Sequence, residues 1–406
     1  MTHLTETSEK IPPLVLKNTL QKYAWGSHSA IQELMGADPT GEPWAELWMG
    51  AHPKAPSQVN IDGRWTSLNE VLRQFPEKIL GLETAKKFNN TLPYLFKVLA
   101  AEQPLSIQAH PDALQAKAGF ERESAAGIKM AEPVRNYKDP FHKPECICAV
   151  TKFIGLKGFR KIFTTRELIQ RFCPKGLARE LKFLERGDLK TFFKSVMELP
   201  TSQKKSAIDE ARRSAKTSIP TDMIADWIIN LHGYYPEDVG VLSPLFLNLF
   251  CLSPGEALFL PCGELHAYLS GMGIEIMANS DNVLRGGLTP KHVDVPELMQ
   301  VLDFTETDLH ILKPEPVSPC EKKYPVLAEE FELSVVDVTD KAPCIFLGRH
   351  GAEILICING VAHLTFGAIG NKGIGIKKGE SVFIPAETNP YEISGNARCY
   401  KAGVPL

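Results

Sequence analysis

Short runs of alternating apolar and polar residues mark the first and last parts of the chain. One of them is "PLSIQAHPD", residues 104–112, in which Ser106, Gln108 and His110 alternate with apolar residues. Successive side chains of a strand point to opposite faces, so the three polar side chains share one face while the apolar ones face the core. A solvated face of a half-buried strand is the ordinary interpretation. A functional interpretation depends on what the rest of the chain places beside this strand.

The spacing of apolar residues changes between residues 160 and 250. Runs such as "TTRELIQRF" and "DMIADWIINLHGYY" repeat apolar residues at intervals of three and four, with charges between them. This pattern is typical of amphipathic helices. Thr164 or Thr165 is a suitable N-cap for the first helix, and Gly176 and Gly187 are expected to interrupt the helical run. Strand-like runs return at about Leu249, so we predict a block of three or more helices between strand-rich regions.

A weak internal repeat links the strand-rich regions. Residues 254–271, "PGEALFLPCGELHAYLSG", and residues 378–395, "KGESVFIPAETNPYEISG", share Gly-Glu-x-x-Phe-aliphatic-Pro and end alike in aliphatic-Ser-Gly. We interpret them as two copies of one module of short antiparallel strands. His266 of the first copy corresponds to Pro390 of the second, and proline offers no ligand atom. Residues 311–406 are therefore expected to lack a metal, with His350 and His363 as ordinary residues.

Composition narrows the class of protein. A chain of 406 residues suggests two or three domains. Its hydrophobic fraction of 44% and charged fraction of 23% are typical of soluble globular proteins. The net charge of −3 gives no reason to expect a nucleic acid or an anionic membrane as partner. No apolar run approaches the length of a membrane span, and the polar start "MTHLTETSEKIPPLVLKN" lacks the features of a signal peptide.

The nine cysteines show no CxxC spacing. Most lie in apolar, strand-like runs, such as Cys146 and Cys148 in "ECICAV" and Cys357 in "EILICING". We expect them to be small buried hydrophobic residues in a reducing cytoplasm, and we expect no disulfide framework.

The segment "GEALFLPCGELH" carries a candidate metal ligand. Its pattern, G-x5-P-x-G-x2-H from Gly255 to His266, resembles the second sequence motif of the cupin superfamily, whose jelly-roll barrels commonly hold a metal. Gln108 and His110 on one strand and His266 on another are expected to face the same interior. Glu145, at the start of "ECICAV", is the expected carboxylate, and His142 is the competing candidate. Such a mixed nitrogen and oxygen set suits Zn²⁺, with Fe²⁺, Mn²⁺ or Co²⁺ as alternatives.

A second polar segment follows His266. In "GIEIMANSDNVLRGGLTPKHVDV" the first half alternates around Glu275, and Arg285 and Lys291 follow. A solvated loop is one interpretation. The other is a basic rim over the metal, where both cations suit a phosphate or an enediolate oxygen. Lys97 and Lys143 lie close in sequence to the other ligands and are candidates for the same anion pocket.

Together these segments resemble the type I phosphomannose isomerase family, zinc enzymes that interconvert mannose 6-phosphate and fructose 6-phosphate. The similar pieces span about residues 20–300 in family order: "YAWGS", "AELWMGAHPKAPS", "LFKVLAAEQPLSIQAHPD", "HKPE", "LPCGELHAY" and "SDNVLRGGLTPKHVDV". Two departures stand out. Pro140-Phe141 precede His142 where the family often has a polar residue, and about fifteen extra residues precede the first match, which we expect to be a disordered tail.

The resemblance implies a mainly β fold of two cupin-like jelly-roll modules with an inserted helical domain. It implies a metal-binding domain of residues 1–155 and 251–310, a helical domain of residues 156–250, and a degenerate cupin-like domain of residues 311–406. One Zn²⁺ per chain would be held by Gln108, His110, Glu145 and His266. The resemblance matches Arg285 to an active-site arginine of the family, and Glu275, Lys291, Lys143 and Ser106 to residues that handle the substrate. We assign Arg285, Glu275 and Lys291 as catalytic residues, and Ser106, Lys143 and Lys97 as substrate-binding residues. We expect a cytoplasmic monomer that binds a sugar phosphate, with no nucleic acid and no membrane.

The sequence leaves the chemistry partly open. Aldose–ketose interconversion needs a base, and Glu275, a lysine or a metal-bound hydroxide are all candidates. Arg285 does not readily lose its proton, so we assign it to charge stabilisation. Two other classes fit the fold: a cupin metalloenzyme of different chemistry, such as a dioxygenase, and a non-catalytic sugar-binding cupin. Oxygen uptake would identify the first, and absence of turnover would identify the second.

Overall fold

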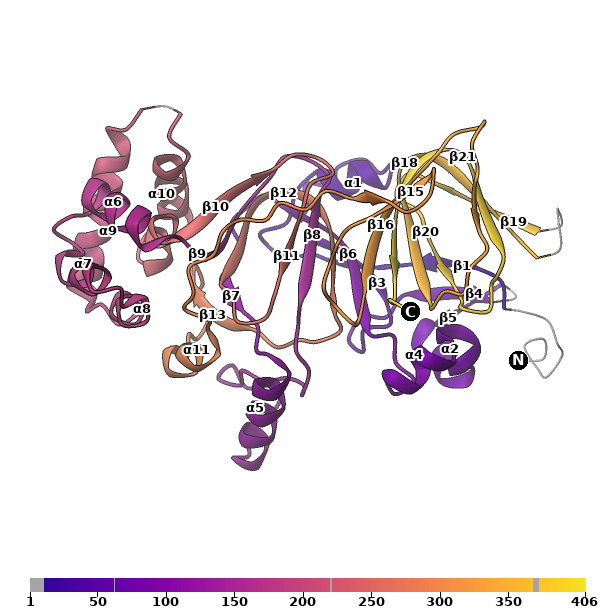
Figure 1. The fold of residues 1–406 in the computed structure, drawn as a ribbon, viewed down its shortest axis with the longest axis horizontal. Coiled ribbons are helices and arrows are strands. Elements are labelled where there is room, and N and C mark those ends of the chain that lie inside the picture. Colours follow the sequence, from indigo (N-terminus) through magenta and orange to yellow (C-terminus); the bar gives the residue numbers. More distant parts are fainter. Residues whose placement is uncertain (1–10, 62, 220, 368–371) are drawn as a thin grey trace.

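The computed structural model describes residues 11–61, 63–219, 221–367 and 372–406. Within these residues, antiparallel strands form two β modules that lie side by side, and a group of helices lies beyond the first module (Figure 1). This arrangement agrees with the predicted mainly β fold with an inserted helical domain. No helix of the described residues is both long enough and apolar enough to cross a membrane.

The first module is built around one long strand, β12. Its strands are β2 (Thr19–Gln21), β3 (Glu46–Gly50), β6 (Tyr94–Ala101), β7 (Ile107–Ala109), β8 (Glu145–Ala149), β9 (Phe153–Phe159), β10 (Leu247–Leu252), β11 (Ala257–Leu260), β12 (His266–Ala278) and β13 (Leu284–Gly287). Strand β12 pairs with β7 and β9 near its start and with β6 and β8 farther along. One strand thus carries both His266 and Glu275.

The second module repeats part of this plan. Its strands are β14 (Glu315–Pro316), β15 (Glu321–Lys323), β16 (Glu332–Val338), β17 (Cys344–Phe346), β18 (Glu353–Phe366), β19 (Lys372–Lys377), β20 (Ser381–Ile384) and β21 (Tyr391–Gly403). In the first repeated sequence lie β11 and the start of β12, and in the second lie β20 and the start of β21, so the two repeats correspond strand by strand. His266 begins β12, whereas Pro390 directly precedes β21.

The N-terminal strands do not follow the predicted domain limits. Strands β1 (Leu14–Lys17), β4 (Gln58–Ile61) and β5 (Arg64–Ser67) extend the sheet of the second module, because β1 pairs with both β20 and β4. The expected disordered tail is also too long. Residues 1–10 lie outside the described residues, but Ile11 is buried and its N–H donates to the carboxylate of Glu387. Long-range strand pairing orders this segment, and nothing local in the sequence indicates it.

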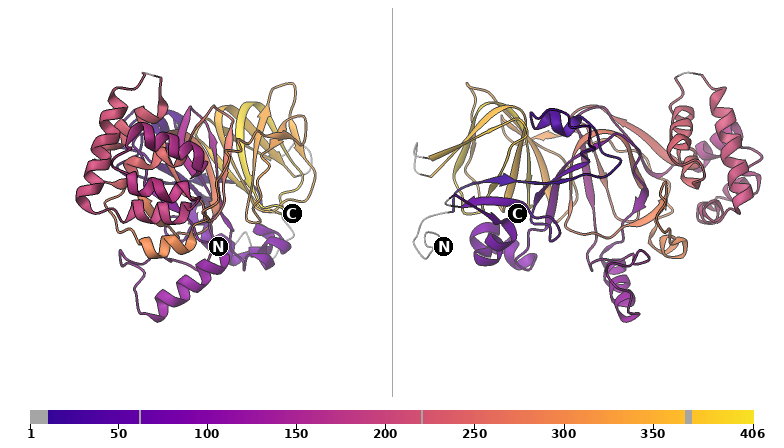
Figure 2. Two further views of the ribbon diagram at one scale, coloured as in Figure 1. Left: turned by 60° about the vertical axis from the view of Figure 1, so that its left-hand side comes forward. Right: turned by 180° about the vertical axis from the view of Figure 1, so that it is seen from behind.

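The helical block forms an insertion between two paired strands, β9 and β10. It consists of α6 (Ile162–Phe172), α7 (Ala178–Glu185), α8 (Leu189–Met197), α9 (Thr201–Lys216), α10 (Met223–Tyr234) and the 3₁₀ segment η1 (Val239–Leu245). The predicted breaks at Gly176 and Gly187 are confirmed, since both lie between helices. The predicted cap is wrong: Lys161 precedes α6, and Thr164 and Thr165 lie inside the helix. Figure 2 shows this group at one end of the molecule.

Several further helices lie in regions where the alternating pattern predicts strands. They are α1 (Ala30–Leu34), α2 (Leu68–Gln74), α3 (Pro76–Leu80), α4 (Leu82–Lys87), α5 (Ala113–Ala125) and α11 (Val295–Val301). Helix α5 directly follows "QAHPD" and begins with a capping box, in which the Asp112 carboxylate accepts from the N–H of Gln115. The Asp112 cap ends the strand segment that carries His110.

The cysteine prediction is partly wrong. Cys146, Cys148, Cys173, Cys357 and Cys399 are free and buried, as expected. Cys320 and Cys344, however, form a disulfide, with Cα atoms 5.7 Å apart. Strand β17 brings Cys344 beside the segment before β15 only in the folded second module, so sequence spacing does not reveal the pair.

Candidate metal and sugar-phosphate site

Three buried side chains from three strand segments converge inside the first module. His266 begins β12, Glu145 begins β8, and His110 directly follows β7. The Nε2 atoms of His110 and His266 lie 3.3 Å and 3.2 Å from the two carboxylate oxygens of Glu145. Among the described residues, these three form the one group of histidine, cysteine and carboxylate side chains with spacing suited to a metal, its ligand atoms within 4.8 Å of one another.

Backbone carbonyls orient both imidazole rings. The Nδ1 of His110 lies 2.6 Å from the carbonyl oxygen of Asn282, and the Nδ1 of His266 lies 3.2 Å from that of Glu264. A neutral ring that donates from Nδ1 presents a free lone pair at Nε2. Both Nε2 atoms are buried and, within the described residues, have no hydrogen-bond partner. Buried polar atoms are rarely left so, and these atoms fit a divalent cation between them and Glu145.

The surroundings of His110 and Glu145 keep these two residues in their ligand forms. Burial, assisted by the Lys143 ammonium, lowers the pKa of His110 to about 4, so the ring is neutral at neutral pH. Burial alone would raise the pKa of Glu145, but Lys143 and His110 outweigh it and hold that pKa well below its usual value. The Nζ of Lys143 lies 2.9 Å from the Glu145 carboxylate.

Gln108 lies between the metal group and the cationic side of the site. Strand β7 pairs with β12 and β13, which places Gln108 directly opposite His266 and Arg285. Residues directly opposite each other on antiparallel strands share a face. Gln108 therefore points toward the metal group, and its role as fourth ligand stays a prediction. The competing ligand His142 does not join the group, because its Nε2 lies 2.6 Å from Glu330 of the second module.

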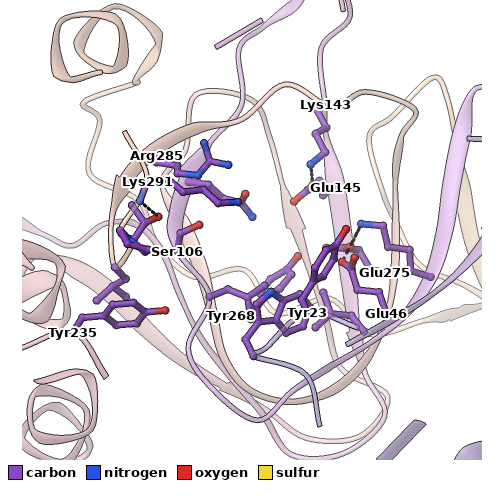
Figure 3. Close-up of a pocket in the computed structure, with 18 residues that line it drawn as sticks. Tyr23, Glu46, Ser106, Lys143, Glu145, Tyr235, Tyr268, Glu275, Arg285 and Lys291 are labelled. Carbon is purple, nitrogen blue, oxygen red and sulfur yellow. Dashed lines mark hydrogen bonds and ion pairs between the residues drawn. The ribbon is translucent and has the colours of Figure 1, made fainter. Parts of the chain in front are cut away.

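A cavity of about 380 Å³ opens beside this group. The predicted residues Lys97, Ser106, Gln108, Lys143, Glu145, Glu275, Arg285 and Lys291 all line it. Figure 3 shows Arg285, Lys291 and Ser106 on one side of the cavity and Glu275 and Glu46 on the opposite side. The structure thus brings together every residue that the sequence predicts for the site.

A buried lysine sits between two carboxylates on one wall. The Nζ of Lys97 lies 2.8 Å from Glu275 and 3.3 Å from Glu46, because β6 runs between β12 and β3. Burial opposes the charge of Lys97, but Glu275 and Glu46 outweigh it and raise its pKa. Burial raises the pKa of Glu275, and Lys97 only partly offsets this. Lys97 is therefore held protonated, while Glu275 is a carboxylate of increased basicity.

The opposite wall offers cations without counter-ions. Within the described residues, neither Arg285 nor Lys291 has an ion-pair partner. Arg285 is half-buried, and burial lowers the pKa of its guanidinium without removing its charge at neutral pH. Unpaired cations that line a cavity favour an anionic ligand such as a phosphate group.

Asn282 supports the site from behind, a role that sequence analysis does not single out. Its buried side chain accepts from the N–H of Lys138 and donates to the carbonyls of Asp139 and Phe141. Asn282 thus joins the segment before Glu145 to the carbonyl that orients His110. The Phe141 side chain is exposed, so Phe141 takes part in this support through its backbone carbonyl.

Other residues of the cavity are not predicted from the sequence. Tyr23, Glu46, Tyr235 and Tyr268 line it together with the predicted residues. Tyr235 follows the last α-helix of the insertion, and its hydroxyl donates to the Pro104 carbonyl at 2.9 Å. Tyr268 lies two residues after His266 on the same strand, and that spacing is the one local signal that indicates it.

Comparison with known proteins gives the same assignment. Models of the phosphomannose isomerase type I catalytic domain, the type I helical insertion domain and the mannose-6-phosphate isomerase cupin domain match residues 14–162, 177–247 and 320–402. Mannose-6-phosphate isomerase of Escherichia coli is 40% identical over 94% of this chain and 97% of its own length. The human protein of that name is 36% identical over 71% of this chain and 73% of its own length.

Solved structures agree with the sequence comparison. A mutant of phosphomannose isomerase from Salmonella typhimurium superposes with a TM-score of 0.91 at 38% identity, covering 98% of this chain and all of the other. A holo, zinc-bound mannose 6-phosphate isomerase superposes with a TM-score of 0.90 at 38% identity, again over 98% of this chain. On these matches, together with the convergent site, the chain belongs to the type I phosphomannose isomerase family.

Proposed function

We propose that this chain interconverts mannose 6-phosphate and fructose 6-phosphate with one Zn²⁺ held by Gln108, His110, Glu145 and His266. The supporting observation is a buried group of unpartnered ligand atoms that faces a cavity with unpaired cations. The ligand atoms would hold a metal that suits the hydroxyl and carbonyl oxygens of a sugar phosphate. The unpaired cations suit its anionic group. A bound Zn²⁺ would polarise and orient the sugar oxygens at the reacting carbons.

The reaction moves a proton between C2 and C1 while the carbonyl shifts the other way. Its base must accept a proton near neutral pH, which favours a group with a perturbed pKa. We assign this role to Glu275, whose pKa burial raises. Lys97 is unsuited to the role because Glu275 and Glu46 hold it protonated. It would instead orient the Glu275 carboxylate and donate to a sugar oxygen.

The cationic wall would hold the charges of the substrate. Arg285 lies opposite Gln108 in the strand register and therefore beside a predicted ligand. Lys291 follows later in the chain and is exposed. We therefore assign Arg285 to the charge that develops on the enediolate oxygens, and Lys291 with Ser106 to the phosphate. Lys143 faces Glu145 and the cavity, where it would contact a substrate oxygen. The expectation of a cytoplasmic monomer stays a prediction.

Solvent deuterium tests the proton-transfer route. We expect mannose 6-phosphate incubated with the protein in D₂O to acquire deuterium at C2, and its product at C1, as observed by NMR. Glu275→Gln should lower both turnover and exchange by about 10²-fold or more, the usual scale for a lost general base. Zinc content should remain unchanged. Turnover that continues without any deuterium at either carbon would contradict the enediolate route, and normal exchange in Glu275→Gln would refute its role as base.

A further inference from the structure

A second cavity, of about 370 Å³, lies in the second module and takes no part in the proposed reaction. Its walls come from β15, β16 and β21, which are labelled toward the right of Figure 1, and from the segment between β17 and β18. The disulfide between Cys320 and Cys344 joins two of these walls, next to Glu321 and Ile345. The cavity is therefore lined both by strands of the second module and by the segment of residues 347–351.

A buried lysine between two carboxylates lines this cavity. The Nζ of Lys401 lies 3.0 Å from Glu321 and 2.9 Å from Glu353. The same ammonium lies 4.3 Å from the ring centroid of Phe346. The hydroxyl of Tyr391 donates to the second oxygen of Glu353 at 2.7 Å. Lys401 and Glu353 are both buried, with side chains 6% and 4% exposed.

The same arrangement lines the first cavity. There Lys97 lies between Glu46 and Glu275, with its ammonium 5.4 Å from the ring centroid of Trp48. The internal repeat does not produce this similarity. Lys401 is on β21, which corresponds to β12, whereas Lys97 is on β6. The two cavities therefore acquired the same chemistry from different strands.

The hydrogen-bonding capacity of this group determines what it can bind. An ammonium has three donors, and its two carboxylate neighbours occupy two of them, while each carboxylate keeps free acceptor sites. Lys401 is already paired with Glu321 and Glu353, so an anion placed beside these carboxylates would gain no unpaired cation there. Arg349 also lines the cavity and has no ion-pair partner among the described residues, but its side chain is exposed. Hydroxyl groups suit such a site, since each can donate to a carboxylate and accept from the ammonium. Among the described residues, no metal-binding group lies here.

We propose that the second cavity binds a neutral hexose as a non-catalytic sugar site. The comparison with the first cavity rests on the proposed function, since it assumes that Lys97 and its two carboxylates face a sugar. The hydrogen-bonding argument for Lys401, Glu321 and Glu353 stands independently.

Saturation-transfer NMR with free D-mannose and the zinc-loaded protein tests this proposal. We expect Glu321→Gln to lower the mannose signal at least threefold, because it removes one charged acceptor that faces the cavity. Tyr391→Phe keeps the aromatic ring but removes the hydroxyl that holds the Glu353 carboxylate in place, so it should also lower the signal. This variant serves if Glu321→Gln fails to fold. Glu380→Gln, an exposed residue of the same module outside the cavity, is the matched control and should leave the signal unchanged.

Mannose 6-phosphate turnover, measured on the same samples, separates this proposal from the proposed function. Glu321→Gln and Tyr391→Phe should keep turnover within about twofold of the wild type, which also shows that they are folded. A mannose signal that both variants leave intact, or that only Glu275→Gln removes, overturns the second site. A mannose signal that depends on Glu321 in a protein without turnover would support the second site and refute the proposed function alone.

Discussion

His110→Ala should leave the protein without its metal and lower isomerase turnover by about 10³-fold or more. The Nε2 of His110 is buried beside Glu145 with no hydrogen-bond partner among the described residues, so its removal takes away a ligand that no neighbour replaces. Metal-ion stabilisation of developing charge is worth several kcal/mol, which corresponds to that factor in rate. Elemental analysis of the purified variant should find far less than one zinc per chain.

His142→Ala provides the matched control for this experiment. His142 lies on the segment just before Glu145, but its ring points to Glu330 and away from the metal group. The His142 variant should keep its zinc. Unchanged zinc in His110→Ala, or zinc lost from His142→Ala alone, would show that the ligand set is wrong.

Arg285→Ala should lower kcat by about 10²-fold or more while changing KM and zinc content much less. The guanidinium lines the cavity without a counter-ion, and its strand neighbour is Gln108. A fixed cation there interacts more strongly with an enediolate than with the neutral ground-state oxygens, so its loss acts mainly on the transition state. Gly287, with φ of 127°, lets β13 turn beside η1 and so fixes the position of Arg285.

Arg285→Lys distinguishes a fixed planar cation from simple positive charge. We expect it to recover little activity, because an ammonium on a flexible stem does not reproduce the planar fork of arginine. Steady-state kinetics of both variants give the decisive comparison. A loss that appears mainly as a higher KM would show that Arg285 binds the phosphate, contrary to the role assigned here.

The positions of the candidate ligand residues could be predicted because their signals are local. Alternation in "PLSIQAHPD" places Gln108 and His110 on one face, and the repeat places His266 at a strand start where the second copy has Pro390. Both features survive in the structure because strand period and turn chemistry act over a few residues. The helical insertion could be predicted for the same reason, from its apolar spacing.

The missed features depend on contacts between distant parts of the chain. Strand β1 belongs to the second module only because it pairs with β20, more than 360 residues later. The Cys320–Cys344 disulfide, the Asn282 support of His110 and the contribution of Tyr235 to the cavity likewise arise from tertiary packing. Thr164 and Thr165 are plausible caps in isolation, but the chain enters α6 earlier, where Glu306 accepts from the N–H of Ile162.

Isomerisation of mannose 6-phosphate before chelation, after chelation and after return of zinc tests the central claim most directly. We expect turnover in the purified protein, its loss when the metal is removed, and its recovery when one equivalent of Zn²⁺ per chain is restored. Full turnover by a protein shown by elemental analysis to hold no metal would contradict the account, as would a zinc-loaded protein that never converts the substrate.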